Sequence, residues 1–95
     1  MKFNDIELKK NLPKKGFEID PSKDHIYYYF TYKGKKTGIF TKISHSSRKK
    51  IISGDLLKNI KKQLKLDSNS ELIDLIKCPM SEEDYIDILK NNGNL

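Results

Sequence analysis

The run His25–Tyr32 is rich in aromatic and β-branched side chains, which favour an extended strand over a helix. Lys33 and Gly34 follow it and suit a tight turn, after which residues 37–43 return as a second strand. Upstream, apolar and polar residues alternate over 17–21 and indicate a shorter strand that ends at a proline. Three consecutive short strands predict an antiparallel meander.

Side chains of a strand alternate between the two faces of its sheet, so the aromatic run divides into two sets. The set expected to face the core is Ile26, Tyr28 and Phe30. The set expected to be partly exposed is His25, Tyr27 and Tyr29. One face of the sheet is therefore predicted to remain open to a ligand.

Helices are predicted before and after the three strands in the sequence. The first is short: Asp5 is its expected cap, Pro13 limits it to about two turns, and Gly16 offers a left-handed exit. Its apolar positions are expected to be Ile6, Leu8 and Leu12. Ser53 is expected to cap a second helix, which follows a polar, basic loop over 44–52. The apolar stripe of that helix is Leu56, Leu57, Ile60 and Leu64.

Two further short helices are predicted near the C-terminus from their caps. Ser68 with Glu71 three residues later forms a capping-box pattern, and Ser81 precedes three acidic residues that suit a helix start.

The predicted fold class is therefore α+β. It is an α-β-β-β-α sandwich with an antiparallel three-stranded sheet, helices on one face and two short C-terminal helices. Residues 1–66 form the expected core, and residues 67–95 an acidic helical extension packed on the same domain.

Charge is distributed unevenly along the chain. Residues 1–66 carry 17 Lys/Arg and 6 Asp/Glu, a net charge of +11, whereas residues 67–95 carry 2 Lys and 7 Asp/Glu, a net charge of −5. A basic body attracts polyanions, chiefly nucleic acid or an anionic membrane. An AT-rich genome that encodes lysine wherever it is tolerated would explain the same composition. No apolar run is long enough for a membrane span or a signal peptide, so we expect a cytoplasmic protein with no membrane partner.

The chain has two histidines, His25 at the start of the long strand and His45 just after its partner strand. An antiparallel hairpin that turns near Lys33 and Gly34 would bring both to the same end of the sheet. RNA carries its own nucleophile, the 2′-OH, so cleavage needs a base for that proton and an acid for the leaving 5′-oxygen. Histidine titrates near neutral pH and performs either role. His25 and His45 are therefore the candidate catalytic residues, although either could be an ordinary surface or cap residue.

Cationic and aromatic side chains near the histidines are candidates for RNA binding. Ammonium and guanidinium groups would stabilise charge on the phosphorus, and tyrosines would stack on unpaired bases. Aromatic residues in strands more often serve core or cross-strand packing, and a solvated helix face explains the lysines of the 53–66 helix equally well. The candidate RNA-binding residues are Lys23, Lys42, Arg48, Lys49, Lys50, Lys61, Lys62, Tyr27 and Tyr29.

Other catalytic templates do not fit the sequence. No glycine-rich phosphate loop lies between a strand and a helix, and no carboxylate cluster is typical of a magnesium nuclease. One cysteine and two histidines are too few for a typical four-ligand zinc site built from Cys and His. No metal and no cofactor are expected. Cys78 is expected to be a small buried residue.

The order of these features resembles the HicA toxin family. It comprises a short helix, Gly16-Phe17, a strand that opens with His25, the Ser44-His45 step, and Gly54 before a helix that ends near Gln63. The resemblance covers about residues 3–66. It implies a fold similar to a double-stranded-RNA-binding domain, and an mRNA-cleaving toxin neutralised by a HicB-type antitoxin.

In that family the histidine of a Gly-Ser-His motif is regarded as catalytic, and the corresponding residues here are Lys23-Asp24-His25. The family's Pro-x-His corresponds to Ile43-Ser44-His45, without the proline. The leading hypothesis is a metal-independent endoribonuclease toxin. The alternatives are a non-catalytic RNA-binding module of the same fold, and an interaction protein whose working surface is the acidic helices.

Overall fold

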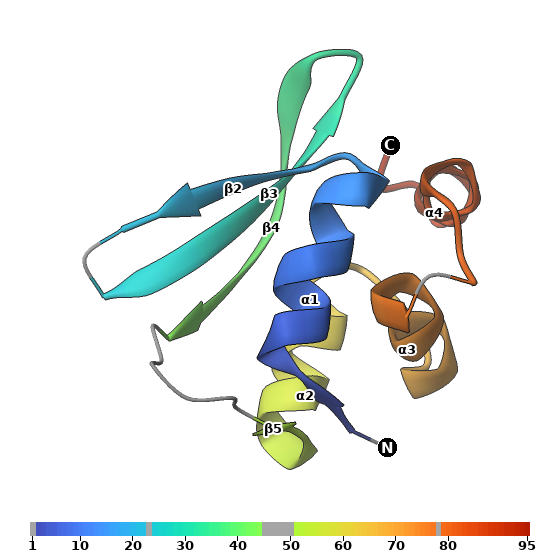
Figure 1. Cartoon of the computed structure of the whole chain (residues 1–95). Helices are drawn as coiled ribbons and strands as arrows, with labels where there is room; N and C mark the ends of the chain where they lie inside the picture. Colours follow the sequence, from blue (N-terminus) through green and yellow to red (C-terminus); the bar gives the residue numbers. More distant parts are fainter. Residues whose placement is uncertain (1, 23, 45–50, 78) are drawn as a thin grey trace.

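The computed structural model describes residues 2–22, 24–44, 51–77 and 79–95. Its centre is an antiparallel sheet of three strands in the order β2-β3-β4, formed by Phe17–Pro21, His25–Tyr32 and Lys35–Ser44 (Figure 1). Four α-helices accompany the sheet within the described residues. The α+β fold class predicted from the sequence is confirmed.

The turn between β3 and β4 follows from its two central residues. Lys33 and Gly34 have φ values of 52° and 79°, and Tyr32 pairs directly with Lys35 across the turn. Two consecutive positive φ values define the primed turn whose twist matches that of a β-hairpin. The hairpin therefore forms where the sequence predicted it, and its tip extends beyond the helices (Figure 1).

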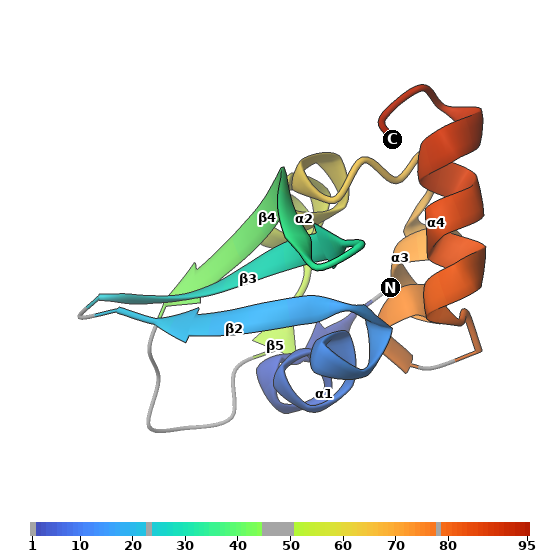
Figure 2. The same cartoon turned by 90° about the horizontal axis from the view of Figure 1, so that it is seen from above.

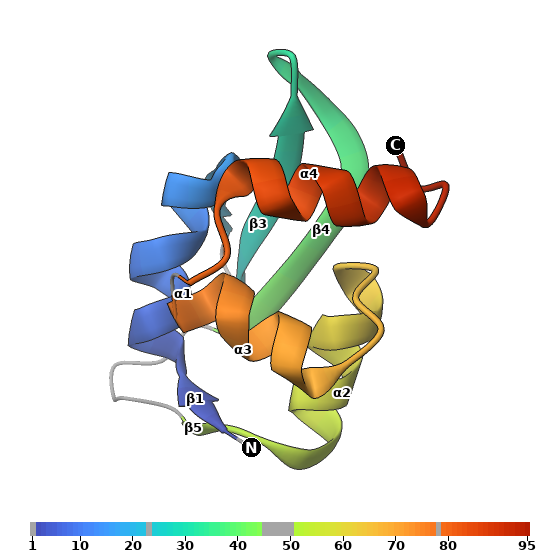
Figure 3. The same ribbon diagram turned by 90° about the vertical axis from the view of Figure 1, so that its right-hand side faces the viewer.

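The helices pack on one face of the sheet. The elements are α1 (Asp5–Asn11), a 3₁₀ turn (Leu12–Lys15), α2 (Gly54–Gln63), α3 (Asn69–Lys77) and α4 (Glu82–Asn91). In Figure 3, α3 lies between α1 and α2, and both of these helices contact it. Seen from above, α4 stands at the side of the molecule away from the β2–β3 turn (Figure 2). Among the described residues no helix is both long and apolar enough to cross a bilayer.

A second, two-stranded sheet was not predicted. β1 (Phe3–Asn4) pairs antiparallel with β5 (Ile51–Ile52), so the loop expected over 44–52 is wrong at its last two residues. It is also wrong at Ser44, which is the last residue of β4. Phe3 and Ile52 lie opposite each other, and their side chains are 3% and 0% exposed. Burial of this apolar pair explains why two short segments, far apart in the sequence, are extended and paired.

The helix starts were predicted with mixed success. Asn4, not Asp5, caps α1, because its side chain accepts a hydrogen bond from the Glu7 backbone N–H at 2.8 Å. Of the apolar positions named for this helix, Leu8 and Leu12 are buried, whereas Ile6 is 55% exposed. Ser53 occupies the cap position of α2 but makes no side-chain capping bond. The predicted cap of α4 is confirmed, since Ser81 and Asp84 exchange reciprocal hydrogen bonds.

The core joins the sheet to the C-terminal helices through aromatic contacts. The ring of Phe30 lies 5.1 Å from that of Phe17 and 4.9 Å from that of Tyr85 on α4, centroid to centroid. The Tyr85 hydroxyl donates to the Leu64 carbonyl at 2.8 Å. These contacts make α4 part of the same hydrophobic core as the sheet.

Tyr28 is a buried phenol that gives a pH-dependent prediction. Its side chain is fully buried, its hydroxyl has no hydrogen-bond partner among the described residues, and burial, helped by the Asp5 carboxylate, raises its pKa from 10.0 to about 12. The unfolded chain therefore loses this proton at lower pH than the folded chain does. Stability from this group is fully present below pH 10.0 and is lost as pH rises through about 12.

Urea unfolding of the wild type and Tyr28→Phe as a function of pH tests this expectation. The free energy of unfolding of the wild type should fall more steeply above pH 10.0 than that of the variant. The difference should reach about 2–3 kcal/mol, because one pKa unit corresponds to about 1.4 kcal/mol. Parallel pH profiles for the two proteins would show that Tyr28 ionises in the fold as it does in the unfolded chain.

Candidate functional site

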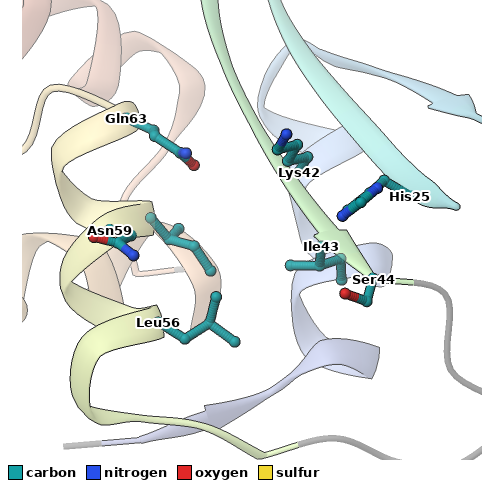
Figure 4. Close-up of a pocket in the computed structure, with 8 residues that line it drawn as sticks. His25, Lys42, Ile43, Ser44, Leu56, Asn59 and Gln63 are labelled. Carbon is teal, nitrogen blue, oxygen red and sulfur yellow. The ribbon is translucent and has the colours of Figure 1, made fainter.

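A pocket of about 190 Å³ lies between the end of β4 and the side of α2. Figure 4 shows the pocket between residues of β3 and β4 on one side and residues of α2 on the other. It is lined by His25, Lys42, Ile43, Ser44, Leu56, Asn59, Ile60 and Gln63. Its apolar members, Ile43, Leu56 and Ile60, belong to the hydrophobic core or pack against it. Its polar members carry an imidazole, an ammonium, a hydroxyl and two amides.

His25 is placed by the backbone of the β2–β3 turn. Its carbonyl accepts hydrogen bonds at 2.8 Å from both the backbone N–H and the hydroxyl of Ser22, and its own N–H lies 3.3 Å from that hydroxyl. His25 is the first residue of β3 and pairs with Ser44, the last residue of β4. The imidazole is partly buried and lines the pocket, so a ligand in the pocket could reach it.

The other polar groups of the pocket come from β4 and α2. Lys42 and Ser44 are two residues apart and are exposed, so they share the face of the sheet opposite to the core. Asn59 and Gln63 are one turn apart on α2 and line the same side of the pocket. The buried Thr41 hydroxyl donates to Gln63 Oε1 at 2.6 Å, which joins α2 to the edge strand and holds the Gln63 amide in place.

An aromatic row lies beside the pocket on the open face of the sheet; it consists of Tyr27, Tyr29 and Phe40. The two tyrosine rings are 5.8 Å apart and nearly parallel, at 8°. The Phe40 ring lies 5.5 Å from that of Tyr29 and 6.2 Å from that of Tyr27. The tyrosines were predicted from the sequence, but Phe40, which is 38% exposed, was missed.

Lysine ammonium groups lie over the aromatic row. Lys36 Nζ is 4.4 Å from the Tyr29 ring centroid, and Lys42 Nζ is 5.9 Å from that of Tyr27. Such cation–π contacts keep the cations at the ring faces and on the open side of the sheet. Lys42 was predicted from the sequence and Lys36 was not. A signal for Lys36 was present in the sequence, because it lies two residues after Gly34 and a tight hairpin places it opposite Thr31, close to Tyr29.

Two other predicted site residues, Lys61 and Lys62, lie away from the pocket. Lys61 donates to the Asn69 side chain at 3.1 Å, towards α3, and Lys62 is exposed on α2 without lining the pocket. Outside the described residues are Lys23, His45, Arg48, Lys49, Lys50 and Cys78. The predicted proximity of His25 and His45 therefore stays a prediction. Within the described ranges, no three His, Cys, Asp or Glu side chains are grouped so that they could hold a metal ion.

Comparisons with known proteins give no assignment for this site. No family model matches the chain, no curated protein matches it, and no solved structure matches it. The chemistry of the pocket and of the aromatic row has to be inferred from their own residues.

Proposed function

We propose that the chain is an endoribonuclease of the HicA toxin type, in which His25 is an acid or base for cleavage of messenger RNA. The observation that carries this proposal is that His25 and Lys42 line the same pocket. A group that moves protons and a cation that attracts phosphate thus share one site open to solvent. The order of a helix, three antiparallel strands and a helix also agrees with the family's fold.

The chemistry needs few groups because RNA supplies the nucleophile. A base removes the 2′-OH proton, the 2′-oxygen attacks phosphorus, and an acid protonates the departing 5′-oxygen. His25 would perform one of these proton transfers, and Lys42 would stabilise the negative charge on the phosphoryl oxygens. His45 is the proposed partner for the other transfer. It follows Ser44 directly in the chain, and Ser44 pairs with His25.

Incubation of the purified protein with single-stranded RNA in EDTA tests the proposal. We expect cleavage to persist in EDTA, because no step above needs a metal ion. A matched RNA with 2′-deoxy sugars should remain intact, since it lacks the nucleophile. An intact RNA substrate, or efficient cleavage of the 2′-deoxy strand, would contradict the mechanism.

The biological role follows from the same activity. We propose that the protein acts in the cytoplasm as a growth-arresting toxin whose partner is a HicB-type antitoxin. Expression of the chain alone should stop growth, and His25→Ala should relieve the arrest at equal protein level. A small neighbouring open reading frame that restores growth when it is co-expressed would be the antitoxin. Equal growth arrest by the wild type and by His25→Ala would show that the toxicity does not depend on RNA cleavage by His25.

A second candidate function is a non-catalytic RNA-binding module. The aromatic row favours it, because stacked tyrosines with lysines above them hold RNA without any proton transfer. This function predicts salt-sensitive RNA binding with no products, and affinity that is unchanged in His25→Ala.

A further inference from the structure

We propose that the open face of the sheet selects unpaired RNA, with bases stacked on the aromatic row and base edges read by Glu18 and Asp20 of β2. This inference rests on the proposed function, for which it names the substrate class. It concerns binding, however, and is testable without any cleavage. It extends the site from the pocket across all three strands.

The aromatic row is available to a ligand. The buried residues of β3 and β4 are Tyr28, Phe30, Ile39, Thr41 and Ile43, all of which belong to the face covered by helices. The row occupies the opposite face, where its rings are partly or well exposed. Each base has a π-face that can stack on such a ring, and the contact requires the base to be unpaired and unstacked. A duplex hides these surfaces and should bind poorly.

Charge on the open face is arranged across the strands. On β4, Lys36 and Lys42 lie over the tyrosine rings. On β2, the exposed Glu18 pairs with Tyr29 and the exposed Asp20 pairs with Tyr27. Directly opposite residues of neighbouring strands have Cβ atoms about 5 Å apart, so each tyrosine has a carboxylate beside it. Phosphates would therefore lie on the β4 side, bases over β3, and base edges towards β2.

The two carboxylates would favour bases that present an amino group. An ionised carboxylate only accepts hydrogen bonds. Cytosine offers its N4 amino group at the position where uracil presents the O4 carbonyl, which a carboxylate repels. Cytosine and uracil have the same size and similar stacking. A difference in affinity between them therefore reports the contact of the carboxylates with the N4 amino group or the O4 carbonyl. The face should prefer cytosine, and adenine for the same reason, over uracil.

The aromatic row also leads to the pocket. The His25 ring lies 6.3 Å from that of Tyr27, which in turn stacks on Tyr29. A single strand that follows these three positions would run from the middle of β3 to the imidazole at its first residue. Stacking would thus deliver a phosphodiester of unpaired RNA to the proposed catalytic group.

Fluorescence anisotropy with short 2′-fluoro oligonucleotides tests the stacking, because these strands lack the nucleophile and are not cleaved by the proposed route. The wild type should bind a single strand more tightly than the matching duplex. Tyr27→Ala and Tyr29→Ala should each weaken single-strand binding by roughly 10-fold, the usual loss for one stacked base. Tyr32→Ala is the matched control, because Tyr32 lies on the same strand but packs towards the core and Lys90. It should leave the affinity unchanged.

The base preference is tested with oligocytidine and oligouridine. The wild type should favour oligocytidine by roughly 10-fold, the discrimination expected of a specific base contact. The double variant Glu18→Gln/Asp20→Asn should abolish the preference, because amides both donate and accept. The control is Glu83→Gln/Asp87→Asn on α4, which removes the same amount of charge outside the aromatic row. This variant should keep the preference for oligocytidine. An effect of net charge alone would shift both affinities equally and leave their ratio intact.

The outcomes separate this inference from the nuclease proposal. Equal or tighter binding of the duplex, or affinity that survives both tyrosine substitutions, would overturn the inference even if the protein cleaves RNA. Selective binding of single strands without any cleavage of RNA would uphold the inference and remove the nuclease function. Equal affinity for oligocytidine and oligouridine in the wild type would overturn the reading of base edges.

Discussion

Replacement of His25 by alanine is expected to lower the rate of RNA cleavage by roughly 10²- to 10⁴-fold, the contribution typical of one general acid or base. Affinity for RNA should stay close to that of the wild type, because the aromatic row and the lysines above it are retained. The measurement is the single-turnover cleavage rate of a labelled RNA in EDTA, alongside anisotropy with an uncleavable strand.

The control for this variant is Asn91→Ala, an exposed position at the end of α4. Its cleavage rate should match that of the wild type. A full cleavage rate in His25→Ala would remove His25 from the mechanism. A loss of affinity that equals the loss of rate would assign His25 to binding rather than to proton transfer.

Phe30→Ala is expected to lower the free energy of unfolding by about 3–5 kcal/mol, the range found for buried aromatic residues. Phe30 is fully buried, and its ring contacts those of Phe17 and Tyr85, so its removal leaves a cavity between the sheet and α4. A domain of this size is typically stable by only about 5–15 kcal/mol, so the variant should be close to unfolding. Urea unfolding followed by circular dichroism measures the change.

Phe40→Ala provides the matched comparison for Phe30→Ala. Phe40 lies on the neighbouring strand but on the open face, where it is 38% exposed. Its loss should cost about 1 kcal/mol or less, and should instead weaken RNA binding. If both substitutions lower the free energy of unfolding equally, Phe40 must be as buried in solution as Phe30 is, and the open face would then be covered.

The sequence was most informative where side-chain alternation and turn chemistry agree. The aromatic run, the turn at Lys33-Gly34 and the period of two predicted which face of β3 is buried, and the structure has Tyr28 and Phe30 fully buried. Local chemistry of this kind acts over a few residues, so it can be read without knowledge of the rest of the fold. The cap at Ser81 belongs to the same class.

Apart from the caps of α1 and α2, the failures involve contacts that are distant in the sequence. The pairing of β1 with β5 joins residues 3–4 to residues 51–52, and nothing local favours strands of two residues. Lys15 is another example: this lysine is buried, and its ammonium donates to the carbonyls of Leu75 and Met80. These hydrogen bonds satisfy a backbone carbonyl near the end of α3 and one in the segment that follows α3. A lysine in a basic sequence gives no sign of such burial.

The site was predicted in part. His25, Lys42, Tyr27 and Tyr29 were identified from residue type and strand position, and they lie together on the open face or in the pocket. Phe40 was missed because β3 and β4 change register between Tyr29 and Thr31, which places Phe40 opposite Tyr29. That irregularity decides which β4 residues lie beside the tyrosines. The α2 side of the pocket, with Asn59 and Gln63, depends on tertiary packing and had no signal in the sequence.

The nature of the product ends tests the central claim most directly. If His25 assists attack by the 2′-oxygen, cleavage in EDTA should leave a 2′,3′-cyclic phosphate on one fragment and a 5′-hydroxyl on the other. Mass spectrometry of the fragments from one defined RNA identifies both ends. Products with 5′-phosphate ends, or the same cyclic products at the same rate from His25→Ala, would contradict the account.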